Sequence, residues 1–319
     1  MKATVKPSKI HGSIVAPPSK SYTHRAITVG SLSESSEIFY PLVSEDILAT
    51  VNACEAFGAD ITLSEKKASV KGFNGKPGIP KDVIDCKNSG TTLRFMSGIA
   101  SLVHGITVLT GDESLRSRPN TPLLDALSDL VAKAISTRGN GCAPLIIKGR
   151  LKGGKIKIDG SISSQFISSL LIACPLAERD TSIEVRNLKS RPYVEMTLEL
   201  IDVAGVKIES TEEGFKMEGN QEYDLKSFKI PGDFSSASYI LAGAAITDSE
   251  VEVRNLFPSK QGDSAIVDIL RSMGARISWE RERGIVRVKG ANLRGIFVDA
   301  SETPDLVPTI AVLGLVAEG

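Results

Sequence analysis

The chain of 319 residues has few of the side chains that bind metals or form disulfides. It contains three histidines and four cysteines, and no two cysteines form a C-x-x-C pair. This composition argues against a disulfide-stabilised scaffold and makes a zinc centre hard to assemble. Cys54 and Cys174 fall within apolar helical patterns, where cysteine packs as a small hydrophobic side chain.

The sequence also lacks an excess of charge and any long apolar run. Lys and Arg number 38, as do Asp and Glu, whereas a protein that binds nucleic acid through its phosphates normally carries a basic excess. No apolar run approaches the roughly 18–20 residues that span a bilayer. Residues 1–5 alternate like a first strand and form no apolar signal core. We therefore expect a folded cytoplasmic protein that binds neither nucleic acid nor a membrane.

What the sequence does contain is an internal repeat. Apolar helical segments with polar starts recur at intervals of 70, 74, 72 and 70 residues, near Ser19, Ser89, Ser163, Ser235 and Asp305. Between them lie blocks with an amphipathic helix, a glycine and two strands, clear at 45–72, 191–219 and 263–290 and looser at 118–149. The glycines that follow the clear helices suit left-handed C-terminal caps. The pattern predicts βαβαββ modules in which one helix is buried and the other lies outside.

The last copy of the repeat is incomplete. It starts at Asp305 and stops at Gly319, without the strand, outer helix and hairpin of the other copies. A buried helix at this point would leave apolar surface exposed. We therefore expect a C-terminally shortened chain that lacks roughly one to two modules.

Polar and cationic side chains collect at the starts of the apolar helices. A helix N-terminus carries unpaired N–H groups and a partial positive charge, which attract anions, although serine and asparagine there can also be simple N-caps. Lys20, Arg25 and Arg94 accompany these starts, and Arg118 and Arg191 each precede a proline, where we expect a loop. Any one of these arginines could be a solvated charge. Together they predict a pocket for a small, highly anionic ligand.

These segments together resemble the EPSP synthase (3-phosphoshikimate 1-carboxyvinyltransferase) family. The matches follow the whole chain in order: PPSKS at 17–21 with Arg25, NSGTTLR at 88–94, GDESL at 111–115 before Arg118, GSISSQF at 160–166, SRPY at 190–193, GDFSSA at 232–237 and PD at 304–305. The resemblance implies an α/β fold, a two-domain inverse α/β barrel of repeated βαβαββ modules whose last modules are incomplete here. Residues 18–230 would form the second domain of three modules. Residues 1–17 and 231–319 would form the first, which is discontinuous and truncated. The active site would lie in the cleft between them.

The resemblance also implies an activity. It is the transfer of the enolpyruvyl group of phosphoenolpyruvate to the 5-hydroxyl of shikimate 3-phosphate with release of phosphate, a step toward chorismate and the aromatic amino acids. The reaction needs no metal or organic cofactor, and we expect a monomer. The implied shikimate 3-phosphate site comprises Lys20, Ser21, Arg25, Ser163, Ser164, Gln165, Ser190, Tyr193 and Asp305. The implied phosphoenolpyruvate site comprises Lys20, Gly90, Arg118 and Gln165. Asp305 and Lys20 would be the catalytic residues, Asp305 as the base at the 5-hydroxyl and Lys20 in contact with both substrates. Asn88 would shape the loop before Gly90, and Asp46 and Asp233 would have supporting roles.

Two alternatives remain open at this stage. In the family, further Asn, Lys, Glu and Arg residues of the site follow the Asp by a few tens of residues or more, beyond Gly319. The 319-residue chain would then be catalytically poor, and a non-catalytic shikimate 3-phosphate-binding fragment is one alternative. The other is UDP-N-acetylglucosamine enolpyruvyl transferase, which shares the architecture. That family carries a cysteine in a loop before its Arg-Pro, and residues 111–117 contain none.

Overall fold

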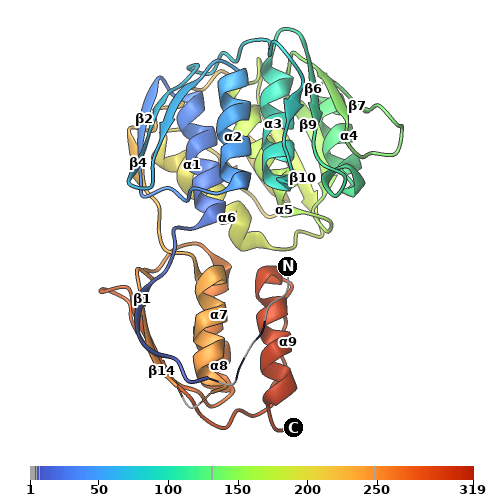
Figure 1. Ribbon diagram of the computed structural model, residues 1–319. Coiled ribbons are helices and arrows are strands. Elements are labelled where there is room, and N and C mark those ends of the chain that lie inside the picture. Colours follow the sequence, from blue (N-terminus) through green and yellow to red (C-terminus); the bar gives the residue numbers. More distant parts are fainter. Residues whose placement is uncertain (1–3, 5, 7, 131, 248) are drawn as a thin grey trace. The chain divides into compact units, whose positions relative to one another are not determined.

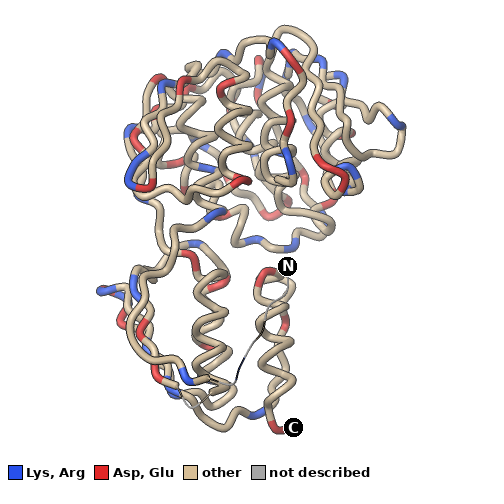
Figure 2. Tube along the Cα trace, in the orientation of Figure 1, with Lys and Arg blue, Asp and Glu red and all other residues tan. Residues whose placement is uncertain are grey.

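The computed structural model describes residues 4, 6, 8–130, 132–247 and 249–319 (Figure 1). The chain divides into two compact units, each with its own hydrophobic core. Unit 1 comprises Met1–Ser19 and Pro231–Gly319, and unit 2 comprises Lys20–Ile230. Within the described residues, no helix is both long and apolar enough to cross a membrane. Figure 2 shows acidic and basic residues interspersed along both units, as the balanced composition leads one to expect.

The described part of unit 2 contains three four-stranded sheets of one design. In each sheet, the first two strands in the spatial order given below are parallel, and the other neighbouring pairs are antiparallel. The first sheet has the order β13 (Ser227–Lys229), β2 (Ser35–Phe39), β4 (Lys67–Lys71), β3 (Asp60–Leu63). The second has the order β5 (Ile84–Asp85), β6 (Ile106–Thr110), β8 (Leu145–Lys148), β7 (Lys133–Ser136). The third has the order β9 (Gly154–Asp159), β10 (Thr181–Arg186), β12 (Gly214–Met217), β11 (Glu209–Ser210).

The helices of unit 2 fall into two classes by burial. The helices with polar starts and apolar bodies, α1 (Lys20–Leu32), α3 (Gly90–Leu102) and α5 (Ser164–Ala173), are buried almost all round. The amphipathic helices α2 (Glu45–Ala56), α4 (Thr121–Asp129) and α6 (Arg191–Val203) bury one face. Short 3₁₀ turns, η1 (Leu115–Ser117) and η2 (Cys174–Leu176), connect them to neighbouring segments. The predicted pairing of one buried and one outer helix per module is confirmed.

Unit 1 repeats the same sheet design. Its strands have the order β1 (His11–Val15), β14 (Glu250–Arg254), β16 (Ile285–Lys289), β15 (Arg276–Glu280). Its helices are α7 (Phe234–Ala245), η3 (Gly262–Ala265), α8 (Ile266–Ser272), η4 (Pro304–Leu306) and α9 (Val307–Val316). Helix α9 buries only Thr309 and Leu313 and exposes apolar side chains such as Leu315.

Two strands belong to a different unit from the helix that follows them in sequence. Strand β1 precedes α1 of unit 2 but pairs with β14 of unit 1, and β13 precedes α7 of unit 1 but pairs with β2 of unit 2. The connecting segments pair with each other: Ser19 N donates to Pro231 O at 2.8 Å, and Asp233 N donates to Pro17 O at 2.8 Å. A side chain at Gly232 would place Cβ 1.9 Å from the backbone oxygen of Asn255, so only glycine fits there.

Most local expectations hold, one lies outside the described residues and one is wrong. Gly58, Gly205 and Gly274 have φ values of +109°, +84° and +98°, which confirms the predicted left-handed conformation after each helix. The strand predicted at residues 1–5 lies almost wholly outside the described residues, and the first described strand is β1. Arg191 is the first residue of α6, although we expected it on a loop. Proline at the second helical position explains this difference, because its fixed φ is compatible with a first turn.

Candidate functional site

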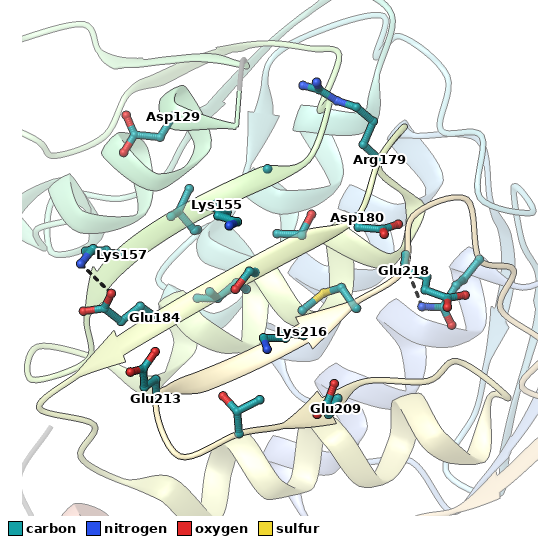
Figure 3. Close-up of a pocket in the computed structure, with 18 of the residues that line it drawn as sticks. Asp129, Lys155, Lys157, Arg179, Asp180, Glu184, Glu209, Glu213, Lys216 and Glu218 are labelled. Atoms are coloured by element: carbon teal, nitrogen blue, oxygen red, sulfur yellow. Dashed lines mark hydrogen bonds and ion pairs between the residues drawn. The ribbon is translucent and has the colours of Figure 1, made fainter.

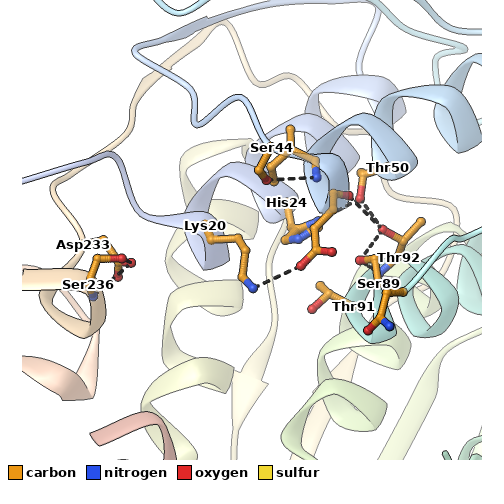
Figure 4. A network of polar contacts seen from close by, with 12 residues as sticks. Lys20, His24, Ser44, Thr50, Ser89, Thr91, Thr92, Asp233 and Ser236 are labelled. Carbon is orange, nitrogen blue, oxygen red and sulfur yellow. Dashed lines mark hydrogen bonds and ion pairs between the residues drawn. The ribbon is translucent and has the colours of Figure 1, made fainter. Parts of the chain in front are cut away.

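Side chains of α1 and α2 and of the start of α3 are joined by hydrogen bonds within unit 2 (Figure 4). His24 Nδ1 lies 2.7 Å from Thr50 Oγ1, and Thr50 Oγ1 lies 2.6 Å from Thr92 Oγ1. Thr92 donates to Ser89 Oγ at 2.7 Å, and Ser89 in turn caps α3 by accepting from Thr92 N. These contacts join α1 through the body of α2 to the N-terminus of α3, a helix that begins about seventy residues after α1 in the repeat.

Arg94 connects the start of α3 to the start of α5. Its Nη1 donates to Gln165 Oε1 at 2.7 Å and to Ser163 Oγ at 3.2 Å, and Gln165 Nε2 donates to Thr91 Oγ1 at 3.0 Å. The guanidinium also lies 4.9 Å from the ring centre of Phe166. Burial, and secondarily the positive charge of Arg118, lower the pKa of Arg94 to about 10. No described carboxylate pairs with Arg94, so its charge is available to an anion.

Arg118 lies beside the first residue of α3. A Cβ built on Gly90 would be 3.1 Å from Arg118 Nη1, so the absence of a side chain at position 90 keeps the space beside the guanidinium open. Arg118 Nη2 donates to Asn88 Oδ1 at 2.6 Å and, more weakly, to Ser114 Oγ at 3.4 Å. Within the described residues, Arg118 has no carboxylate partner either. Two arginines without a carboxylate partner among the described residues, beside a helix N-terminus, have the charge and geometry suited to an anion.

Lys20, by contrast, has an acidic partner. Its Nζ lies 3.1 Å from Asp46 Oδ2, and the lysine side chain is 52% exposed. An ion pair this exposed is weak and can exchange the carboxylate for another anion. The backbone oxygen of Asp46 lies near the start of α3, 3.4 Å from Thr92 Oγ1.

Arg25 is buried, with 2% of its surface exposed. Its Nε donates to Thr197 Oγ1 at 2.8 Å, Nη1 to Ser21 O at 2.9 Å and Nη2 to Tyr193 O at 2.8 Å. Burial lowers its pKa to about 10. Arg25 therefore ties α1 to α6 and brings Ser21 and Tyr193 together, while two of its five N–H groups remain for another acceptor.

The predicted phosphate-binding serines lie at the starts of α5 and α6. Ser163 caps α5 by accepting from Gln165 N at 3.3 Å, and Ser164 is buried in the first turn. Ser190 precedes α6 in the left-handed conformation (φ +55°), which is strained for a residue with a side chain. Its hydroxyl does not cap the helix. The two loops are adjacent, since Lys189 N donates to Gly160 O at 3.5 Å.

Two predicted residues belong to unit 1. Asp305 is exposed and lies in η4, directly before α9. Asp233 is the N-cap of α7: it accepts from the backbone N–H of Ser235 and Ser236, and from Gln261 Nε2 at 2.6 Å. These contacts use both oxygens of Asp233, so its role within unit 1 is to cap the helix.

The structure gives Arg94 and Asn88 roles that the sequence did not predict. Arg94 was noticed as a cation at a helix start, but its position between Ser163 and Gln165 was not foreseen. The sequence signal that could have indicated this role is an arginine four residues after the start of an otherwise apolar helix, because burying a charge is costly unless it is paired or hydrogen-bonded. Asn88 was expected to shape its loop, and the structure shows that it also holds Arg118.

A broad hollow over the sheet β9–β10–β12–β11 contains none of the predicted site residues (Figure 3). Its lining mixes bases such as Lys155 and Lys216 with acids such as Glu209 and Glu213, and Lys157 pairs with Glu184 at 2.7 Å. A surface of mixed charge does not select a polyanion. The arginine-containing helix starts are therefore the candidate site.

Comparisons with known proteins identify the family of this chain. The profile of the family described as EPSP synthase (3-phosphoshikimate 1-carboxyvinyltransferase) matches residues 4–319. Two relatives named 3-phosphoshikimate 1-carboxyvinyltransferase, from Methanosarcina mazei and Methanocella arvoryzae, are each 58% identical and cover 100% of this chain and 76% of their own length. A solved structure of EPSP synthase from Acinetobacter baumannii has a TM-score of 0.82 and 26% identity over 98% of this chain and 73% of that one.

Proposed function

We propose that this chain, which belongs to the EPSP synthase (3-phosphoshikimate 1-carboxyvinyltransferase) family, binds its two anionic substrates at the helix starts of unit 2. The chain is an enzyme of the shikimate pathway, which leads to chorismate and the aromatic amino acids. Its substrates are shikimate 3-phosphate and phosphoenolpyruvate. The reaction transfers the enolpyruvyl group to the 5-hydroxyl of shikimate 3-phosphate and releases phosphate.

The observation that carries the proposed location is the pair Arg94 and Arg118. Both are cations without a carboxylate partner among the described residues, and both lie beside Gly90, within about 4 Å of a Cβ built there. We assign phosphoenolpyruvate to Lys20, Gly90, Arg118 and Gln165. Arg94 contributes charge and holds Gln165 in place. Bidentate N–H groups are well matched to carboxylate and phosphate oxygens.

We assign shikimate 3-phosphate to the neighbouring helix starts. Its 3-phosphate would accept hydrogen bonds from Ser163, Ser164 and Ser190. Its carboxylate would accept from Ser21 and from the two remaining N–H groups of Arg25. The ring would lie near Tyr193 and under Gln165, and Lys20 would contact both substrates. The strained backbone of Ser190 supports this assignment, because its hydroxyl is held outside the helix without a capping role.

The proposed chemistry is an addition followed by an elimination. The Asp305 carboxylate takes the proton of the 5-hydroxyl as the oxygen bonds to C2 of phosphoenolpyruvate. The C2–C3 π bond breaks, and its electron pair takes up a proton at C3, so that the net number of protons is unchanged. In the second step C3 loses a proton, the C2–phosphate bond breaks, and inorganic phosphate leaves. Arg118 and Lys20 stabilise the charge that develops on the phosphate. No electron transfer is involved, and we propose no metal or organic cofactor.

We further propose that units 1 and 2 correspond to the two expected domains, residues 1–17 with 231–319 and residues 18–230, in a monomeric protein. Asp305 is in unit 1 and the arginines are in unit 2. Both units are therefore required for the proposed reaction.

The test is a binding and turnover experiment with matched arginine variants. Phosphoenolpyruvate is titrated calorimetrically in the presence of shikimate 3-phosphate, and phosphate release is measured with shikimate 3-phosphate or with UDP-N-acetylglucosamine as acceptor. Loss of a hydrogen bond to a charged group costs about 1.5–3 kcal/mol, so Arg94→Ala and Arg118→Ala should each weaken binding about 10- to 100-fold. Arg138→Ala, at an exposed hairpin tip, is the control. Equal effects of all three variants, or a preference for the nucleotide sugar, would contradict the proposal.

A further inference from the structure

The side-chain amide of Asn88 lies between the carboxylate of Asp112 and the guanidinium of Arg118. Its Nδ2 donates to Asp112 Oδ2 at 2.6 Å, and its Oδ1 accepts from Arg118 Nη2 at 2.6 Å. The two ends of an asparagine amide have nearly the same shape but opposite hydrogen-bonding character. An ionised carboxylate only accepts, so Asp112 requires the NH₂ end of the amide and leaves the oxygen facing the guanidinium. If the amide turned over, two donors would face each other and the hold on Arg118 would be lost.

Asp112 is itself held in place and kept ionised. Its Oδ1 accepts from Leu115 N at 2.8 Å, and its backbone N–H donates to Lys87 O at 2.9 Å. The Leu115 N–H and the Asn88 amide, followed by the charges of Arg118 and Arg116, lower the pKa of Asp112. The carboxylate thus remains an acceptor at neutral pH, and the orientation of Asn88 is defined.

Asp112 contacts Arg118 only through the amide of Asn88, and this indirect contact affects the charge of Arg118 differently from a direct ion pair. A carboxylate in contact with Arg118 would neutralise the charge that attracts an anion. Here the carboxylate acts through a neutral amide, and Arg118 makes no ion pair with any described residue. The only other hydrogen bond of its side chain to a described residue is the long contact with Ser114 Oγ at 3.4 Å. The position of the guanidinium beside Gly90 therefore depends mainly on Asn88.

We propose that Asp112 is a positioning residue, which orients Asn88 and thereby holds the Arg118 guanidinium ready for an anionic group of phosphoenolpyruvate. The identity of the anion rests on the proposed function, whereas the positioning of Arg118 does not.

A double-mutant cycle tests the proposal. The variants are Asp112→Ala, Asn88→Ala and the double variant, and Asp85→Ala is the control, since Asp85 is also exposed but pairs with Lys87 at 2.7 Å. We expect Asp112→Ala to raise KM for phosphoenolpyruvate and its Kd about tenfold, to change kcat less than twofold and to leave shikimate 3-phosphate affinity unchanged. In the Asn88→Ala background, Asp112→Ala should have no further effect. Asp112→Asn, which offers one acceptor oxygen to two donors, should lie in between.

A second measurement needs no substrate. In NMR spectra of the wild type and of the Asp85→Ala variant, the Nε–H proton of Arg118 should have a chemical shift distinct from that of a mobile arginine and should exchange slowly with solvent. In Asp112→Ala its shift should move to the averaged value of a mobile arginine side chain. Additive losses in the cycle would overturn the proposal, because they would mean that Asp112 acts through Leu115 or the loop. An ordered Arg118 in Asp112→Ala would overturn it as well. If the wild type failed to bind phosphoenolpyruvate, the proposed function would be wrong and the NMR comparison would still decide the positioning role.

Discussion

His24 Nδ1 lies 2.7 Å from the hydroxyl oxygen of Thr50, and this contact joins α1 to α2 inside unit 2. The histidine is 1% exposed, and its Nε2 is buried with no hydrogen-bond partner among the described residues. The hydroxyl chain continues to Thr92 and Ser89 at the start of α3. A lone pair without a partner is less costly to bury than an N–H without one, so the arrangement favours the Nδ1–H tautomer of a neutral imidazole.

The first prediction concerns pH. Burial is the main reason that the pKa of His24 falls from 6.5 to about 3, and the charges of Lys20 and Arg25 add to the effect. Below pH 6.5 the unfolded chain takes up a proton at His24 and the folded chain does not, so acidification favours unfolding. Between pH 6.5 and 5 this one group should remove about 2 kcal/mol from the free energy of unfolding. Urea unfolding of the wild type and of the His24→Gln variant between pH 6.5 and 5 measures this loss of unfolding free energy. The difference between the two curves should shrink toward acid pH, and parallel curves would contradict the assignment.

Gly90→Ala should affect ligand binding and leave the fold intact. The added Cβ would lie 3.1 Å from Arg118 Nη1, the end of a flexible side chain, which can move. Alanine is also a better helix former than glycine, so the melting temperature should not fall. Because the displaced guanidinium no longer faces the anion, KM for phosphoenolpyruvate should rise about tenfold. Gly314→Ala in α9, where nothing lies within 4 Å, is the control. An unchanged KM would show that Arg118 is not in contact with this substrate.

Gly98→Ala should destabilise unit 2. A Cβ at position 98 would lie 2.8 Å from the backbone oxygen of Ser169 and 2.7 Å from its hydroxyl, where α3 and α5 pack against each other. The helices would have to separate, which strains the hydrogen bond from Ser169 Oγ to Arg94 O. Overpacking of this kind costs about 1–3 kcal/mol. A lower midpoint in urea unfolding, compared with Gly314→Ala, would confirm the close packing. A midpoint equal to that of the control would show that α3 and α5 accommodate the added methyl group without loss of stability, which would contradict the close packing.

The sequence by itself determined the features that depend on local periodicity. The recurrence of polar helix starts, the difference between apolar and amphipathic helices and the glycines at 58, 205 and 274 all follow from side-chain spacing and from the conformations that each residue allows. For the same reason Ser89 and Ser163 were recognisable as helix starts, and the structure confirms that they are N-caps.

Only the tertiary structure decided which distant groups meet. The periodicity of a segment carries no information about its partners in other modules. It therefore could not show that β1 pairs within unit 1 although α1 belongs to unit 2, or that β13 pairs within unit 2 although α7 belongs to unit 1. It also could not show that Arg94 bonds to Gln165, 71 residues away, or that Asn88 holds Arg118. These contacts depend on how the modules pack against one another. An arginine or asparagine side chain without a protein partner forms hydrogen bonds with water instead, so the local sequence does not specify which residue it will contact.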